Sequence, residues 1–223
     1  AMDYWKIPSG EITNLPYLLK IGRLGGRVIM STGMATLDEV EAAVRVLESA
    51  GTPRGNIWLL HCTTQYPAPL QSVNLRAMDA LASLGCAGVG YSDHTEGIEV
   101  ALAAAARGAV IIEKHFTLSR SLPGPDHKAS LEPDELARLV ASVRKVEAAL
   151  GGGVKEVADA ERPNIEVARK SIVAARAIAE GELFSEDNIT VKRPGNGISP
   201  MRWFDVLGSR APRSFEADEL ISL

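Results

Sequence analysis

Five apolar, β-forming runs recur along the first half of this chain, and a helical pattern follows each of them. The runs centre on Trp5, Val28, Trp58, Val89 and Val110. Roughly thirty residues per unit is the spacing of parallel α/β folds, because two parallel strands need a long crossover connection. Five units suffice for an open doubly wound sheet, but they form only part of an eight-stranded (β/α)8 barrel. Against the open sheet, no G-x-G-x-x-G turn follows the first strand, which ends in KIPSGE.

The most regular unit covers residues 88–117. Gly88–Ser92 and Ala109–Phe116 are predicted strands, and the Ala-rich segment Glu96–Arg107 between them is a predicted helix with Gly108 at its C-cap. Each strand ends in a polar cluster, SDH in the first and EKH in the second. The C-terminal ends of the strands carry the active site in α/β barrels, so these clusters mark the expected site.

Two histidines, His94 and His115, end these clusters. Because side chains alternate along a strand, His94 shares a face with Ser92, and His115 shares a face with Glu113. Two imidazoles on neighbouring strands, each with an oxygen-bearing partner two residues earlier, predict a divalent-metal site. The alternative is that the two histidines are unrelated and are each hydrogen-bonded at their own strand end.

The composition excludes several classes of partner. The 223 residues have a net charge of −4 with both signs interspersed, so we expect no nucleic-acid partner. No apolar run approaches the roughly eighteen residues that span a membrane, and we expect no signal peptide, because polar and turn residues follow Lys6. Cys62 and Cys86 are too few and too irregularly placed for a disulfide framework or a zinc knuckle, which favours a cytoplasmic location.

The character of the chain changes after Thr117. A Pro/Gly-rich loop at 120–129 precedes a predicted helix that ends at about Leu150, where three glycines follow. We therefore predict an α/β domain over 1–150, a polar linker over 151–166 and a small mixed domain over 167–223. The last of these contains two predicted strands, Ser171–Ala174 and Ile189–Lys192.

Seven segments, taken in order, resemble the sialic acid synthase family. They are KIPSGE, VIMSTGMATLDEV, LLHCTTQYPAP, GYSDHTEGIE, IIEKHFTLSRSLPGPDHKASLEPDEL, ARKSIVAA and ITVKRPGNGISP. The resemblance implies a (β/α)8 TIM barrel, here its last five βα units, followed by an antifreeze-like SAF domain. It implies a synthase that condenses phosphoenolpyruvate with an N-acylmannosamine-type sugar and releases phosphate. The first three units, with a catalytic glutamate, then precede residue 1.

The resemblance also assigns roles to single residues. It implies that His94 and His115 bind a divalent metal, usually Mn²⁺, with Mg²⁺ or Co²⁺ as alternatives. Residues matched to substrate binding are Lys6, Ser9 and Ser92 for phosphoenolpyruvate, Tyr66 for the N-acylated amino sugar, and Glu11 and Thr64 on the same rim, although Thr64 stands where Asn or Ser is expected. Residues matched to catalysis are Glu113 and Asp126 near the sugar, and Arg193, which enters the partner's site in a domain-swapped homodimer.

Each assignment has a simpler structural alternative. Glu113 can form a surface ion pair with Lys128 or Arg120, which would contribute little stability. Asp126 lies between Pro125 and His127 and can act only as a turn former. Without the resemblance, Arg193 is one exposed arginine among many. For His61, inside LLHCT, we expect a hydrogen-bonded core histidine rather than a ligand.

Three functions remain open at the level of the sequence. The first is the synthase. The second is an inactive sugar- or metal-binding remnant that pairs through its SAF domain. The third, which follows from the residues alone, is a metal-dependent aldolase or hydrolase on an α/β barrel. Phosphate release that requires both phosphoenolpyruvate and an N-acyl mannosamine distinguishes the first from the others. The sequence does not select among N-acetylneuraminic, legionaminic and pseudaminic acid as products.

Overall fold

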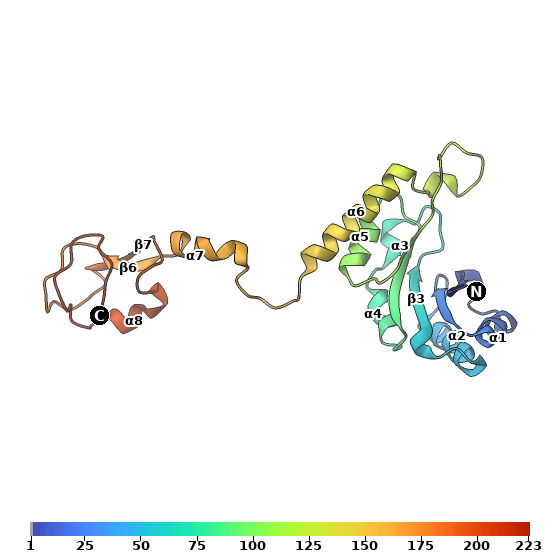
Figure 1. The fold of residues 1–223 in the computed structure, drawn as a ribbon, viewed down its shortest axis with the longest axis horizontal. Helices are drawn as coiled ribbons and strands as arrows, with labels where there is room; N and C mark the ends of the chain where they lie inside the picture. The colour runs from blue at the N-terminus through green and yellow to red at the C-terminus, as the bar shows by residue number, and fades with distance from the viewer. Residues whose placement is uncertain (1) are drawn as a thin grey trace. The chain divides into compact units, whose positions relative to one another are not determined.

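The computed structural model describes residues 2–223, and the chain forms two compact units. The first unit ends at Gly153, and the second runs from Val154 to Leu223 (Figure 1). No helix between residues 2 and 223 combines the length and apolar character that crossing a membrane requires. Each unit is described by itself below.

The first unit is built on a parallel sheet of five strands in the order β1-β2-β3-β4-β5. The strands are β1 (Tyr4–Ile7), β2 (Arg27–Ser31), β3 (Ile57–Cys62), β4 (Gly88–Asp93) and β5 (Ile112–Lys114). Every strand pairs with the next one along the chain, and all four pairs are parallel. A doubly wound sheet reverses its strand order at a switch point, whereas a barrel does not. The predicted α/β class is thus confirmed, and the order is that of a half-barrel.

Helices connect the strands and extend beyond the last of them. They are α1 (Leu15–Leu24), α2 (Leu37–Ala50), α3 (Leu70–Val73), α4 (Ala77–Ala82), α5 (Glu99–Ala106) and α6 (Pro133–Leu150), with 3-10 turns η1 (Ser9–Glu11), η2 (Arg54–Asn56) and η3 (His127–Ala129). Local signals explain where the long ones begin. Thr36 and Glu39 form a capping box at the start of α2, and Asn14 caps α1.

Two predicted elements are shorter in the structure. The helix expected over 96–107 begins only at Glu99, because Gly97 has a φ of +73° and the Glu99 carboxylate binds the Ile98 N–H at 2.9 Å. The strand expected over 109–116 keeps only Ile112–Lys114 as a continuous ladder, and Phe116 instead forms an isolated bridge with Leu131. The C-terminal rim is therefore held at β5 by few strand hydrogen bonds.

One face of the sheet is buried under helices. Val28, Met30 and Leu59 point to this face and pack with α1 and α2 in a single core cluster. A second cluster joins α5 to α6 through Ala101 and Leu139. Right-handed crossovers between sequential parallel strands place every helix on the same side, so alternate side chains point to the opposite, inner face.

The second unit contains an antiparallel pair, β6 (Ser171–Ala174) with β7 (Ile189–Lys192), as the sequence pattern predicted. Short helices accompany the pair: η4 (Asp159–Glu161), α7 (Arg162–Ala168), η5 (Pro200–Arg202) and α8 (Trp203–Val206). Its core includes Ile172, Phe184 and Phe215. The linker expected over 151–166 is not wholly extended, because Pro163 at the first turn starts α7 inside it.

Candidate active site

Polar side chains gather where four of the five strands end. Lys6 of β1 donates to the Ser31 hydroxyl of β2 at 2.9 Å and lies 3.3 Å from a carboxylate oxygen of Glu113 on β5. Ser92 of β4 donates to the other Glu113 oxygen at 2.6 Å. Lys6, Ser31, Ser92 and Glu113 are called the rim cluster below. It joins the two edge strands of the sheet through their side chains.

The Lys6–Glu113 contact shows that the sheet is curved. Neighbouring strands lie about 4.8 Å apart, so in a flat sheet β1 and β5 would be separated by roughly 19 Å. Curvature brings their C-terminal ends close enough for a lysine and a glutamate to meet. The alternative pairing of Glu113 with Lys128 or Arg120 is wrong, because the residues that contact its carboxylate are Lys6 and Ser92.

A tight backbone turn follows β2 beside this cluster. The Gly33 N–H donates to the Ser9 hydroxyl at 3.0 Å. A Cβ atom at Gly33 would lie 2.2 Å from the Thr64 Oγ1 atom and 2.9 Å from the Ser9 Oγ atom, so a side chain here would displace both hydroxyls. The buried Cys62 thiol lies beneath, and its pKa is raised by burial, while hydrogen bonds from Ser9 and other hydroxyls oppose that rise. Ser9 and Thr64 are therefore brought together at the rim.

The two histidines are neighbours on this rim. The ring centroids of His94 and His115 are 5.2 Å apart, and the rings are nearly perpendicular. The Nδ1–H group of His94 donates to the Thr63 carbonyl at 2.8 Å, which leaves its Nε2 atom with a free lone pair. Burial, and then repulsion from a protonated His94, lower the pKa of His115, which favours the neutral ring that a metal ligand requires.

The donor set fits a divalent ion in chemistry and in separation. Imidazole nitrogens bind such ions at about 2.0–2.1 Å, and two rings with centroids 5.2 Å apart can reach one ion between them. Among residues 2–223, no group of three or more His, Cys, Asp or Glu side chains is arranged to hold a metal. A metal ion held by two protein ligands keeps open coordination positions, which substrate or water can fill.

Tyr66 and Asp126 lie close to the histidines. The Tyr66 ring centroid is 4.0 Å from that of His94 and 5.2 Å from that of His115, and the tyrosine is 45% exposed. Burial raises the pKa of Tyr66 first, and the negative charges of Cys62 and Asp126 add to this rise. Asp126 also stabilises the charged form of His115, which opposes the lowering of the pKa of that ring. Asp126 itself lies in an exposed loop, and its charge acts on both rings.

Two predicted site residues are not joined to this cluster. The Glu11 carboxylate accepts from the Asn14 side chain at 2.5 Å and so supports the start of α1. Arg193 belongs to the second unit, is exposed there, and donates through Nε to the Ala168 carbonyl at 3.0 Å. His61 was expected to be a hydrogen-bonded core histidine. Its hydrogen bond is confirmed, since the Nε2 atom lies 2.6 Å from the Val73 carbonyl oxygen, but the residue is only partly buried.

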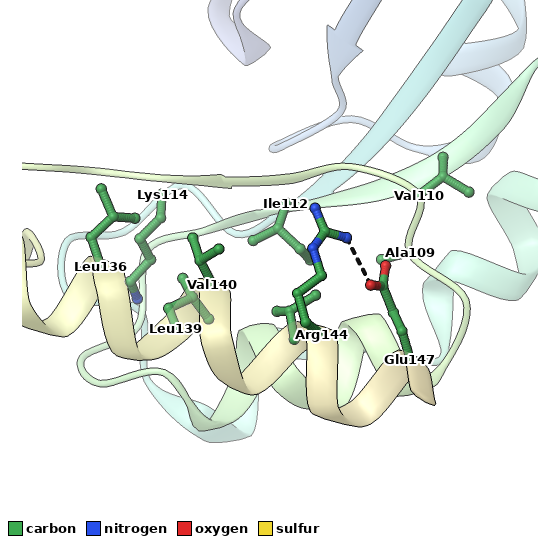
Figure 2. Close-up of a pocket in the computed structure, with 10 residues that line it drawn as sticks. Ala109, Val110, Ile112, Lys114, Leu136, Leu139, Val140, Arg144 and Glu147 are labelled. Carbon is green, nitrogen blue, oxygen red and sulfur yellow. Dashed lines mark hydrogen bonds and ion pairs between the residues drawn. The ribbon is translucent and has the colours of Figure 1, made fainter. Parts of the chain in front are cut away.

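Sequence reasoning missed Ser31 and Gly33. The signal was present, because Ser31 ends the apolar run VIMS in the same way that Ser92 ends its own strand. A cavity of about 330 Å³ between β5 and α6 lies elsewhere, on the helix-covered side of the sheet (Figure 2). Its lining includes Lys114, Leu136 and Leu139, and none of the rim cluster residues.

Comparisons with known proteins show the family to which the chain belongs. The NeuB family matches residues 1–155, and the SAF domain matches residues 169–223. The chain is 55% identical to the N,N'-diacetyllegionaminic acid synthase of Campylobacter jejuni over 99% of its own length and 66% of that relative. It is 44% identical to the enzyme of the same name from Legionella pneumophila over 95% of its own length and 60% of that relative.

A solved structure is also similar. The N-acetylneuraminic acid synthetase of Leptospira borgpetersenii has a TM-score of 0.68 and 40% identity, over 74% of this chain and 57% of that one. The chain thus spans about 57–66% of the lengths of these three relatives. With the family match covering most of the residues, and the half-barrel and SAF unit both present, the chain belongs to the NeuB family of sialic acid synthases.

Proposed function

We propose that the protein containing this chain is a nonulosonic acid synthase, which condenses phosphoenolpyruvate with an open-chain N-acylated amino sugar. The observation that carries the proposal is the placement of the rim cluster beside His94 and His115 at one edge of a curved parallel sheet. The names of the relatives support it, because two are N,N'-diacetyllegionaminic acid synthases and one is an N-acetylneuraminic acid synthetase. We place these strands as the last five of a TIM barrel.

The proposed binding of phosphoenolpyruvate uses the cation and hydroxyls at the strand ends. Lys6 supplies a positive charge, and Ser9, Ser31 and Ser92 supply hydroxyl donors, a combination that suits a phosphate or a carboxylate. Glu113 already contacts Lys6 and Ser92, so it fixes the direction in which both side chains point. We place Glu11 and Thr64 on the same rim as further contacts.

In the proposed reaction, C3 of phosphoenolpyruvate forms a bond to the aldehyde carbon of the sugar, and the aldehyde oxygen takes a proton to become a hydroxyl. Water adds to C2, and the C2–O bond to phosphate breaks, which releases inorganic phosphate. A divalent metal, Mn²⁺ with Mg²⁺ or Co²⁺ as alternatives, held by His94 and His115, supplies Lewis acidity toward oxygen. Lys6 neutralises the phosphate, and Glu113 and Asp126 orient the sugar, so that the reacting carbons meet.

For the sugar, we propose a substrate that yields a legionaminic-type acid. The support is the 55% and 44% identity to two enzymes named for N,N'-diacetyllegionaminic acid. Tyr66 flanks the paired histidines with an exposed aromatic face, which suits the apolar side of an acylated sugar. We also propose a homodimer in which the SAF unit brings Arg193 to the partner's site.

The test is phosphate release by the full-length protein. We expect release only when phosphoenolpyruvate and the N-acylated sugar are both present, loss of release after chelation, and recovery with Mn²⁺. Release from phosphoenolpyruvate without the sugar would indicate a hydrolase instead. Ligand binding without any turnover would favour the inactive binding module. Sedimentation of the same sample tests the dimer, and a monomer would remove Arg193 from the proposed site.

A further inference from the structure

A buried ion pair lies directly behind the rim. The Lys114 ammonium group is 2.8 Å from a carboxylate oxygen of Asp93, and the two side chains are only 3% and 0% exposed. The other Asp93 oxygen accepts from the N–H and the hydroxyl of Thr95 at 2.9 and 2.8 Å. Lys114 also donates to the Thr95 carbonyl. Asp93, Thr95 and Lys114 thus form a closed polar network.

Apolar side chains lie next to the Lys114 end of this network, in a cavity whose lining also includes Arg144 and Glu147. Lys114 lines the cavity between β5 and α6 with Leu136 and Leu139, as Figure 2 shows. Removing two charges from water costs free energy, and an apolar pair of similar volume in the same place would commonly serve stability as well or better. A gain in stability therefore gives little reason for a charged pair at this place. A need to fix the positions of the two strand ends does give a reason for it.

The position of the pair relates it to the site. Asp93 lies between Ser92 and His94 in the sequence, and Lys114 lies between Glu113 and His115. Ser92 is in register with Glu113, and Asp93 is in register with Lys114. Because side chains alternate, the ion pair clamps the outer face of the same strand ends whose inner face carries the Ser92–Glu113 hydrogen bond and the two histidines.

The strand that it clamps has little other support. β5 has only three ladder residues, Ile112–Lys114, and the first two of them are only partly buried. We propose that Asp93 and Lys114 are positioning residues, which set the separation of the β4 and β5 ends and thereby the spacing of His94 from His115 and of Ser92 from Glu113. This inference rests on the proposed function, because it assigns to that site the residues that hold it in shape.

The experiment compares the full-length protein with the double variant Asp93→Asn/Lys114→Met, which removes both charges and leaves neither one unpaired. Mn²⁺ affinity is measured by electron paramagnetic resonance, phosphoenolpyruvate affinity by calorimetry without metal, and folding by thermal melting. We expect a folded protein whose Kd for Mn²⁺ rises about tenfold to a hundredfold, as when outer partners of metal ligands are removed. Thr95→Val, a milder change, is expected to raise the same Kd by about two- to tenfold.

Arg54→Met is the matched control. Arg54 lies just before the start of β3, at the opposite end of the sheet from the rim cluster. Its guanidinium group binds the carboxylates of Glu41 and Glu48 and the Leu84 carbonyl. Its loss is expected to lower the melting temperature and leave both affinities unchanged. The inference would be overturned if the double variant and Thr95→Val both bound Mn²⁺ and phosphoenolpyruvate with the same Kd values as the unaltered protein. If the unaltered protein binds neither ligand, the proposed function fails, and the inference fails with it.

Discussion

The strongest test of the rim cluster is the substitution Lys6→Met, because its effects on binding and on folding are expected to differ widely. Lys6 is 36% exposed and its partner Glu113 is 39% exposed, so water screens this ion pair. Such pairs contribute about 0–1 kcal/mol to the free energy of unfolding. Methionine keeps the length of the side chain and removes its charge and its hydrogen bond to Ser31. We therefore expect the melting temperature to fall by no more than a few degrees.

The expected effect of Lys6→Met on phosphoenolpyruvate is much larger. A hydrogen bond to a charged group contributes about 1.5–3 kcal/mol. Because about 1.4 kcal/mol corresponds to a factor of ten, kcat/KM for phosphoenolpyruvate should fall by roughly ten- to a hundredfold or slightly more. The assay is steady-state phosphate release with the sugar at saturation. Lys145→Met is the matched control, since Lys145 is an exposed lysine of α6, and its kcat/KM should stay at the wild-type value.

The proposed role of Lys6 would be refuted by a Lys6→Met enzyme with unchanged kcat/KM for phosphoenolpyruvate. A loss of activity that parallels a loss of folded protein would also count against it, since the argument requires a folded enzyme that binds its substrate poorly. Lys6→Arg keeps the charge but changes the shape of the donor, so we expect it to retain an intermediate kcat/KM.

Three further predictions follow from the structure. His94→Ala and His115→Ala should each abolish measurable Mn²⁺ binding. His61→Asn is the control and should preserve Mn²⁺ binding, because the His61 ring is bonded to the Val73 carbonyl. Equal Mn²⁺ binding by all three variants would exclude the paired histidines as ligands. Because its pKa is lowered, the His115 ring stays neutral to a lower pH than an ordinary histidine. Mn²⁺ affinity, measured from pH 5 to 8, should therefore persist below pH 6.5 before protonation of the ring removes it. A loss of Mn²⁺ affinity that is complete above pH 6.5 would contradict the lowered pKa. Thr36→Ala should reduce the free energy of unfolding by about 1 kcal/mol in urea without changing Mn²⁺ affinity, because it removes the cap of α2 alone.

Much of the local structure could be predicted from the sequence, because its causes are local. The limits of α1 and α2 coincide with the residues that cap them, and β6 and β7 coincide with their apolar runs. The region after β3 was less predictable. Asn74 adopts a left-handed conformation there and separates α3 from α4. Asparagine tolerates this conformation, but a single asparagine does not by itself predict where a helix ends.

The candidate site divides along the same line. Strand alternation was enough to place Ser92 and His94 on one face of their strand, and Glu113 and His115 on one face of the next strand. The structure pairs Ser92 with Glu113 and His94 with His115. Their contact depends only on two adjacent strands in register. Glu11 was expected on the same rim, and the structure shows its carboxylate accepting a hydrogen bond from the side chain of Asn14, three positions along the chain.

The contact between Lys6 and Glu113 is of a different kind, since it depends on the shape of the whole sheet. These residues lie on the first and fifth strands, and only curvature summed over the three strands between them brings the two together. Gly90 lies on the inner face of β4, where its neighbours leave no room for a side chain. A Cβ atom there would lie 2.4 Å from the Ile111 carbonyl oxygen and 2.5 Å from a Leu60 methyl carbon, so a side chain would force the neighbours apart. The missing side chain is visible in the sequence, but the contact of Lys6, three strands away, with Glu113 requires the folded sheet.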